Sequence, residues 1–145
     1  MIVRLGHLCF RTKRFEDMTS FYLNILELPI KFSLRLPDGR IFGHYFSLGK
    51  TTFLEVFDHS GASEMWGGNA DRLHVHPDST YQHFCLQVTG LETLREGLIK
   101  KGCMVTKIVT GMDGSLQAWI KDPDGNDIEL MEYTDASLQT ASSSL

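Results

Sequence analysis

The chain has 145 residues, of which 42% are hydrophobic and 22% are charged, and its formal net charge at pH 7 is −4. This composition is typical of a globular protein with one domain or two very small ones. The mild acidity argues against nucleic-acid and membrane-surface binding, which need concentrated Lys and Arg, and no apolar window of about 18 residues predicts a transmembrane helix.

Residues 1–58 have the pattern of a strand, a helix and three further strands. Apolar residues in segment 15–26 recur at the three- and four-residue spacing of an amphipathic helix. The turns Pro37-Asp38-Gly39 and Gly49-Lys50 separate the later strand segments. We therefore expect strands over residues 4–11, 29–36, 40–48 and 51–57, with the helix between the first two.

Residues 81–133 repeat this order of elements. We expect strands over residues 81–88, 104–109, 116–121 and 127–133, and a helix over 91–101 that ends at Gly102. The run Gly6-His7-Leu8-Cys9-Phe10 is echoed by Gln82-His83-Phe84-Cys85-Leu86, an offset of 76 residues from position 7 to position 83. Three more landmarks recur in the same order at offsets of 74 to 76 residues. The pattern predicts two tandem βαβββ modules.

The segments outside the repeat have a different composition. Residues 59–80 are rich in Gly, Ser, Asp and His and are expected to form a connecting loop, and residues 134–145 are expected to form a flexible tail. His74 and His76 in the loop are either extra metal ligands, part of a lid or solvated side chains. Cys9, Cys85 and Cys103 lack CxxC spacing, so we expect free thiols in a reducing, cytoplasmic compartment.

In each module the first strand carries a histidine and the last strand a glutamate. The four residues are His7, Glu55, His83 and Glu129. Strand alternation directs each glutamate away from its apolar neighbours, toward the face opposite the helix. Two imidazoles and two carboxylates suit a divalent transition metal with positions open for water or a bidentate substrate. A single strand histidine is more often a core residue, but its recurrence with glutamate favours the metal hypothesis.

The modules resemble those of the vicinal oxygen chelate superfamily, which includes glyoxalase I, methylmalonyl-CoA epimerase, extradiol dioxygenases, and fosfomycin and bleomycin resistance proteins. The matching motifs are the two histidine-containing runs above, Phe21-Tyr22-Leu23-Asn24-Ile25-Leu26, and Asp122-Pro123-Asp124-Gly125-Asn126-Asp127-Ile128-Glu129-Leu130. The resemblance covers about residues 1–133. It implies one α+β domain of two tandem βαβββ modules, residues 1–58 and 81–133, whose mixed curved sheets form a metal-binding cavity.

The four metal positions of the superfamily fall on His7, Glu55, His83 and Glu129. The complete quartet resembles the short bacterial glyoxalase I, which the family associates with Ni or Co more than Zn, with Fe or Mn as further options. Extradiol dioxygenases and fosfomycin resistance enzymes use two His and one Glu. The epimerase branch usually has Gln at the position of Glu55, and bleomycin-binding members lack the metal set.

The resemblance implies a lyase or isomerase that transfers a proton beside a carbonyl through a metal-chelated enediolate. Glu129 would be the catalytic base, and Glu55 a ligand or the group that returns the proton. The substrate would be a small vicinal-oxygen compound such as the hemithioacetal of methylglyoxal and glutathione. Alternatives are an Fe(II)-dependent extradiol-type dioxygenase, an epimerase and a metal-free ligand-binding or resistance protein.

The resemblance also bears on partners and on pocket residues. A glutathione-linked substrate needs cations for its carboxylates, and the candidates are Arg11, Lys13, Arg14 and Arg35. The aromatic and Met candidates, which either line a pocket or belong to the core, are Tyr22, Trp119 and Met131. Short members of the superfamily frequently combine modules from two chains, so we expect a homodimer, although one chain can also close on itself.

Overall fold

The computed structural model describes residues 1, 3–73 and 80–140. The chain divides into two compact units, Met1–Asp78 and Ser79–Leu145, and each contains one four-stranded mixed sheet. This arrangement of two repeated βαβββ modules confirms the predicted α+β class. None of the helices in the described part of the chain is long and apolar enough to cross a membrane.

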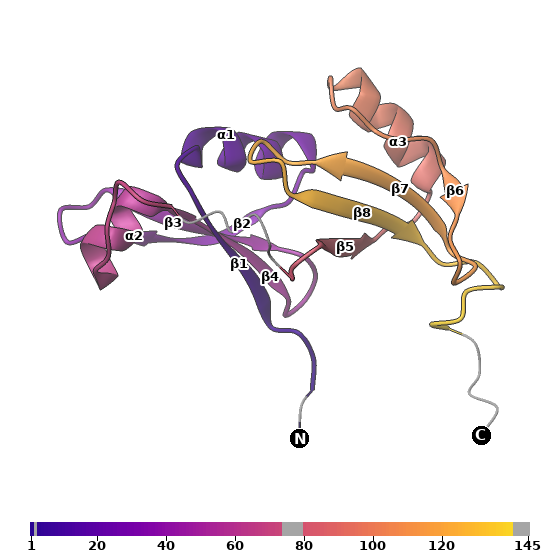
Figure 1. The fold of residues 1–145 in the computed structure, drawn as a ribbon, viewed down its shortest axis with the longest axis horizontal. Helices are drawn as coiled ribbons and strands as arrows, with labels where there is room; N and C mark the ends of the chain where they lie inside the picture. Colours follow the sequence, from indigo (N-terminus) through magenta and orange to yellow (C-terminus); the bar gives the residue numbers. More distant parts are fainter. Residues whose placement is uncertain (2, 74–79, 141–145) are drawn as a thin grey trace. The chain divides into compact units, whose positions relative to one another are not determined.

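The first unit has the strand order β1-β4-β3-β2 (Figure 1). Its elements are β1 (His7–Thr12), α1 (Phe15–Ser20), the π-helix η1 (Phe21–Ile25), β2 (Ile30–Arg35), β3 (Ile41–Ser47), β4 (Phe53–Asp58) and α2 (His59–Trp66). β1 and β4 are parallel, and the other neighbouring strands are antiparallel. The predicted helix over residues 15–26 is confirmed, with its second half wound as a π-helix.

The main core of the first unit lies where α1 meets the sheet. Met18, Tyr22, Phe46, Leu54 and Val56 are all fully buried. Alternation along β4 places the last two on the same face of the sheet, and α1 contacts β4. Tyr22 is therefore a core residue and not a pocket residue.

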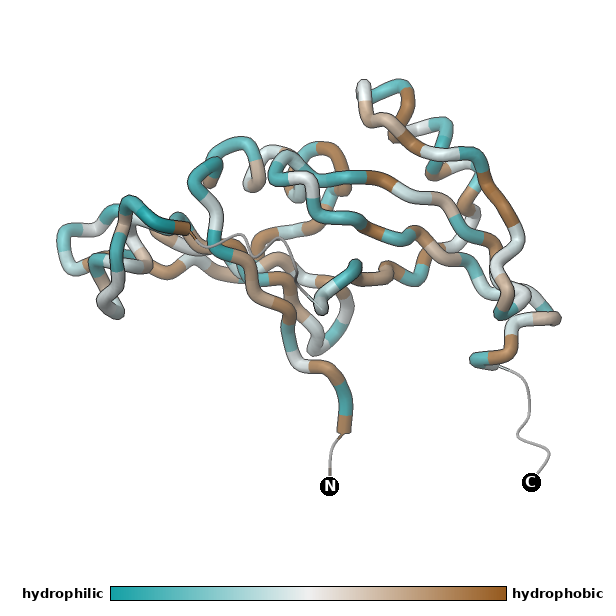
Figure 2. Tube along the Cα trace, in the orientation of Figure 1, coloured by the Kyte–Doolittle hydropathy of each residue, from teal (hydrophilic) through white to brown (hydrophobic). Residues whose placement is uncertain are grey.

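The second unit repeats the plan with the strand order β5-β8-β7-β6. Its elements are β5 (His83–Gln87), α3 (Leu91–Lys100), β6 (Val109–Thr110), β7 (Leu116–Lys121) and β8 (Asp127–Glu132). β5 and β8 are parallel, and α3 contacts β7 and β8 (Figure 1). Leu91, Leu98, Ile128 and Leu130 are almost completely buried. Figure 2 shows the matching alternation of hydrophilic and hydrophobic residues along β8.

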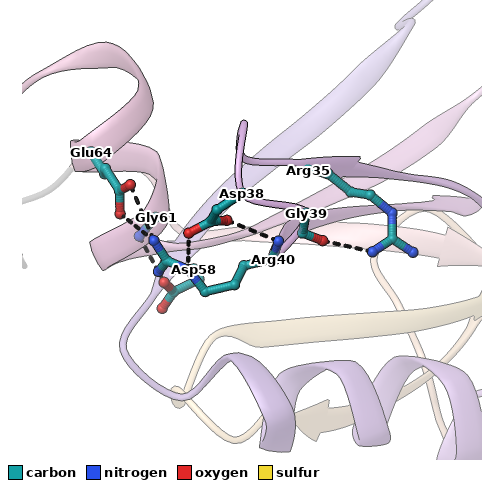
Figure 3. Close-up of polar contacts among 7 residues, drawn as sticks. All are labelled: Arg35, Asp38, Gly39, Arg40, Asp58, Gly61 and Glu64. Carbon is teal, nitrogen blue, oxygen red and sulfur yellow. Dashed lines mark hydrogen bonds and ion pairs between the residues drawn. The ribbon is translucent and has the colours of Figure 1, made fainter.

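The segment predicted as a loop over residues 59–80 begins with a helix, so that expectation was wrong for α2. Asp58 caps the helix, because its Oδ2 accepts a hydrogen bond of 2.7 Å from the N–H of Gly61. Arg40 bridges Asp38 in the β2–β3 turn and Glu64 on α2 (Figure 3). The Gly- and Ser-rich composition of this segment gave no sign of a helix, because α2 is stabilised by packing and capping and not by the helix propensity of its residues.

Two other sequence expectations were wrong in part. In place of the strand expected over residues 104–109, the structure has the short strand β6 at Val109–Thr110. Around Thr106 the regular pairing with β7 is interrupted, because the N–H of Trp119 donates its hydrogen bond to the Thr106 hydroxyl and not to a backbone carbonyl. Residues 134–140, the described part of the predicted flexible tail, are fixed by hydrogen bonds. The Ser137 hydroxyl is buried and accepts hydrogen bonds from the Ser115 hydroxyl and the Thr134 N–H, both at 2.8 Å.

Candidate functional site

The first histidine–glutamate pair lies across the parallel strands β1 and β4. His7 Nδ1 lies 3.3 Å from Glu55 Oε1; the histidine side chain is 57% exposed and the glutamate side chain only 6%. Because Leu54 and Val56 pack on the α1 side, alternation turns Glu55 to the opposite face. The β1–β4 register places His7 two residues before Cys9, the register partner of Glu55, so that strand alternation leaves His7 and Glu55 on the same face of the sheet.

The second pair has the same construction in β5 and β8. His83 Nε2 lies 3.3 Å from Glu129 Oε2, with the histidine side chain 38% exposed and the glutamate side chain 9% exposed. The Trp119 ring on β7 packs edge-on against His83 with ring centroids 4.8 Å apart. Trp119 therefore supports the histidine ring from the side of β7.

The spacing within each pair fits two neighbouring ligands of one metal ion. A direct charge-assisted hydrogen bond is about 2.7–2.9 Å long, shorter than the 3.3 Å observed in both pairs. With metal–ligand bonds of about 2.0–2.2 Å, adjacent N and O ligands lie about 2.9 Å apart at a right angle and about 3.4 Å apart at a tetrahedral angle. Glu55 Oε1 is also buried without a hydrogen-bond partner among the described residues, as expected for a carboxylate oxygen that binds a cation.

A pair alone supplies only two metal donors. Within residues 1, 3–73 and 80–140, no group of three or more His, Cys, Asp or Glu side chains forms a metal cluster. The structure thus brings together His7 with Glu55 in the first unit and His83 with Glu129 in the second. His74 and His76, the other candidate ligands, lie outside the described residues.

A cysteine lies beside each glutamate, on the adjacent parallel strand. The strand register pairs Cys9 with Glu55 and Cys85 with Glu129. Burial raises the pKa of the Cys9 thiol to about 11 and that of the Cys85 thiol to about 12, and the neighbouring carboxylate charge adds to both shifts. Both thiols are free and protonated near neutral pH.

Tyr45 on β3 flanks Glu55 on the side away from β1. The two residues are paired in the β3–β4 register. Burial, followed by a hydrogen bond to Glu55, raises the pKa of Tyr45 to about 12. The phenol therefore stays protonated at neutral pH and can donate to this carboxylate.

A hollow of about 430 Å³ lies beside Glu129 in the second unit. Its lining residues are Cys85, Met112, Asp113, Gln117, Glu129, Met131 and Gln139. Of the candidate pocket residues, Met131 is confirmed as part of the lining. Sequence reasoning missed Asp113, Gln117 and Gln139. Gln117 lies two residues before Trp119 on β7, so strand alternation could have placed it on the same face of the sheet as this candidate pocket residue. Gln139 lies in the segment predicted as a flexible tail, where the sequence gave no signal of a pocket residue.

The candidate cations occupy several different positions. Arg14 pairs with Asp17, while Lys13 and Arg35 donate to the backbone carbonyls of Asp71 and Gly39. Arg11 lines a hollow in the first unit that also includes Arg72. The sequence alone gave no reason to separate Arg11 from the others.

The chain is similar to a known protein superfamily over most of its length. The family model of the Glyoxalase/Bleomycin resistance protein/Dioxygenase superfamily matches residues 4–130. The chain belongs to this superfamily. Among curated proteins, none matches the sequence.

Solved structures share the fold at low sequence identity. A glyoxalase family protein from Enterococcus faecalis is 19% identical with a TM-score of 0.67, covering 89% of this chain and 97% of its own. A lactoylglutathione lyase from Agrobacterium tumefaciens is 18% identical with a TM-score of 0.62, covering 89% and 92%. TnmS3, an antibiotic binding protein from Streptomyces sp. CB03234, is 19% identical with a TM-score of 0.68, covering 92% and 98%. At these identities the similarity defines the fold alone.

Proposed function

We propose that this chain is a metal-dependent lyase or isomerase of the glyoxalase I type. The observation that carries the proposal is the duplicated pair of a histidine and a buried glutamate, each with the 3.3 Å spacing of neighbouring metal ligands. Glu55 Oε1 is buried without a hydrogen bond among the described residues and lies 3.3 Å from His7 Nδ1, which supports a cation at this position. Structural similarity to a lactoylglutathione lyase agrees with the reaction type.

His7, Glu55, His83 and Glu129 are the residues that we propose hold the metal. One pair gives two ligands, and catalytic sites commonly use three protein ligands or more, so both pairs are needed for one ion. They would come from one chain or from two chains of a homodimer. Ni or Co fits the resemblance better than Zn, with Fe or Mn as further options. The bound metal would supply Lewis-acid polarisation of the substrate carbonyl.

Glu129 is the proposed base. Its carboxylate lines the hollow beside β8, where it can accept a proton from a substrate carbon next to the carbonyl. Glu55, whose Oε1 makes no hydrogen bond among the described residues, is the proposed ligand and second proton carrier. Met112 and Met131 give the hollow its apolar surface, and Gln117 and Gln139 offer amide groups that orient a polar substrate.

The substrate proposed is a small vicinal-oxygen compound such as the hemithioacetal of methylglyoxal, with glutathione as one thiol option. A metal-free ligand-binding function is the second candidate. It is favoured by the open hollow in the second unit and by similarity to an antibiotic binding protein. The free state of all three cysteines suits the reducing cytoplasm that we expect for the protein.

The reaction can be tested without oxygen. Purified protein loaded with Ni²⁺ should isomerise the methylglyoxal–glutathione hemithioacetal anaerobically, followed by the absorbance of the thioester product. Glu129→Gln removes the base and should lower kcat by at least 10²-fold, since general-base catalysis contributes about 10²–10⁴-fold. Glu96→Gln, an exposed change on α3, is the matched control and should keep full activity. Turnover that requires oxygen, or a Glu129→Gln variant as active as this control, would contradict the proposal.

A further inference from the structure

The hollow beside Glu129 in the second unit has a lining rich in hydrogen-bond acceptors. Asp113 and Glu129 contribute carboxylates, and no Lys, Arg or His lines the hollow. The thiol of Cys85 is only a weak donor. Which ligand groups the hollow can bind therefore depends on the orientation of its two side-chain amides, Gln117 and Gln139.

Asp113 fixes the orientation of both amides. Its Oδ2 accepts a hydrogen bond from Gln139 Nε2, and its Oδ1 accepts a longer and weaker one, of 3.5 Å, from Gln117 Nε2. An ionised carboxylate has no proton to donate, so each amide has to turn its NH2 group toward Asp113. In the part of the chain that the structure describes, neither Gln117 Oε1 nor Gln139 Oε1 accepts a hydrogen bond. Each amide thus keeps an acceptor oxygen for a ligand.

Asp113 is kept ionised by its neighbours. The N–H of Ser115 donates to Asp113 Oδ1 at 3.2 Å. The hydrogen bond from Gln139, followed by those from Ser115, lowers the pKa of Asp113. The carboxylate is therefore an acceptor at neutral pH, and the two amides keep the orientation that it imposes.

Gln139 reaches the hollow because the chain after β8 folds back against the turn between β6 and β7. The Leu138 N–H donates to the Asp113 carbonyl oxygen at 2.8 Å. Gly114 allows this close approach, because a Cβ added there would lie 2.3 Å from the Ala136 carbonyl oxygen. The position of the Gln139 amide is thus set by backbone contacts on both sides.

We propose that this hollow binds a ligand group that donates hydrogen bonds, an ammonium or a hydroxyl group, and that it rejects a carboxylate. Gln117 and Gln139 accept from this group through their Oε1 atoms, and Asp113 is the positioning residue that orients them. A volume of about 430 Å³ suits a small molecule. As a statement about the substrate, this inference rests on the function proposed above, and it favours a thiol with an amine or hydroxyl end over one with a carboxylate end.

The positioning role of Asp113 makes a specific prediction for Asp113→Asn. The oxygen of the introduced amide still accepts from the Ser115 N–H, so its NH2 group faces Gln139 in place of Oδ2. Two NH2 groups cannot share a hydrogen bond, so the Gln139 amide turns over and presents its own NH2 group to the hollow. The substitution should shift the preference from donor ligands toward acceptor ligands, whereas a merely structural role of Asp113 would weaken all ligands alike.

Titration of the isotope-labelled full chain in EDTA, followed by nuclear magnetic resonance, measures this preference. The probes propylammonium, propanol and propionate have similar sizes and differ in their end group. In wild type we expect saturable shifts of the Gln117 and Gln139 side-chain signals with propylammonium or propanol, and a Kd about tenfold lower than for propionate, the difference typical of one hydrogen bond to a charged group. Asp113→Asn should abolish or reverse this ratio. Asp124→Asn, the same change at an exposed residue outside the hollow, should leave the ratio unchanged.

The outcomes separate the two donor groups. Tighter binding of propylammonium assigns the ligand end as an ammonium group, and tighter binding of propanol assigns it as a hydroxyl group. The proposal would be overturned by propionate binding as tightly as the better of these two probes, by a ratio that Asp113→Asn leaves unchanged, or by the failure of all three probes to bind.

The titration needs no metal, so its result is independent of the proposed reaction. In the Ni²⁺-loaded protein, the hemithioacetal of methylglyoxal with mercaptoethanol should react with a higher kcat/KM than the hemithioacetal with mercaptopropionate. No turnover of either compound, together with the expected titration, would contradict the proposed function and support the specificity of the hollow. Turnover together with tight propionate binding would overturn the specificity and support the function.

Discussion

Glu55 and Glu129 are buried carboxylates whose orientation follows from their immediate neighbours. Each lies between two fully or almost fully buried aliphatic residues on its strand. Burial of these neighbours against a helix turns the carboxylate to the other face, where a histidine of the adjacent parallel strand lies 3.3 Å away. An ionised carboxylate in such a place needs a compensating cation, which the proposed metal ion would supply.

Glu132 provides a pH test at the residue scale. Its carboxylate accepts hydrogen bonds from the N–H groups of Gly90 (2.6 Å) and Leu91 (2.9 Å) at the start of α3, and these bonds lower its pKa. A carboxyl whose pKa is lowered by folding stabilises the protein above its unfolded pKa, about 4.3, and loses that contribution as pH falls through the folded pKa.

Glu132→Gln should therefore lower the urea midpoint at pH 7, and the gap to wild type should shrink as pH falls below about 5. Urea unfolding followed by circular dichroism between pH 7 and pH 3 measures this gap. Glu92→Gln on the first turn of α3 is a control without these hydrogen bonds. A gap that stays constant across the range would show that the Glu132 charge does not hold the helix start.

The histidine–glutamate pattern could be predicted from the sequence because strand alternation is local and the module repeats. Phe15 to Ile25 and the strands β7 and β8 were likewise predictable from periodicity. Gln139 was not, because its position depends on contacts far along the chain. Its amide binds the Asp113 carboxylate at 2.5 Å, and nothing in the composition of residues 134–140 indicates that contact.

At the element scale, α2 shows how packing overrides composition. Gly61 lies inside this helix, and a Cβ added there would come 2.5 Å from Phe42 Cβ. Ala62 is fully buried in a cluster with Leu36, Phe42 and Phe57. The helix exists because a glycine allows close approach to β3, although glycine is a poor helix former.

Gly61→Ala should destabilise the protein despite the helix propensity of alanine, which alone favours it by about 1 kcal/mol. Overpacking typically costs about 1–3 kcal/mol, so the steric term should win. Gly97→Ala in α3 is the matched control, because an added Cβ meets nothing within 4 Å there. Urea unfolding should show Gly97→Ala stabilised by about 1 kcal/mol, and a similar gain for Gly61→Ala would contradict this account of α2 packing.

The end of the chain from Thr134 to Thr140 offers a second test at this scale. Ser137→Ala should cost about 1–3 kcal/mol of unfolding free energy, because it leaves the buried Ser115 hydroxyl and the Thr134 N–H without their partner. Leu138→Ala, at a side chain with 69% exposure, should change it by less than about 0.5 kcal/mol. Equal effects in urea unfolding would mean that residues 134–140 act as a tail after all.

At the scale of the whole molecule, the sequence repeats one fold and one pair of chemical groups. Each module was predictable because its strands, helix and turns carry their own local signals. The proposed sharing of one ion by both pairs would depend on contacts between modules, and such contacts leave no periodicity in the sequence. The central claim is therefore that His7, Glu55, His83 and Glu129 act together as the ligands of one metal.

Metal content per chain tests this claim most directly. Wild type, Glu55→Gln, Glu129→Gln and the control Glu96→Gln are purified without added metal or chelator and measured by inductively coupled plasma mass spectrometry. The account predicts about one transition metal per chain, or per pair of modules, in wild type and control, and a clear loss in both site variants, since each lacks one of about four ligands. Metal retained in Glu55→Gln, or none in wild type, would contradict it.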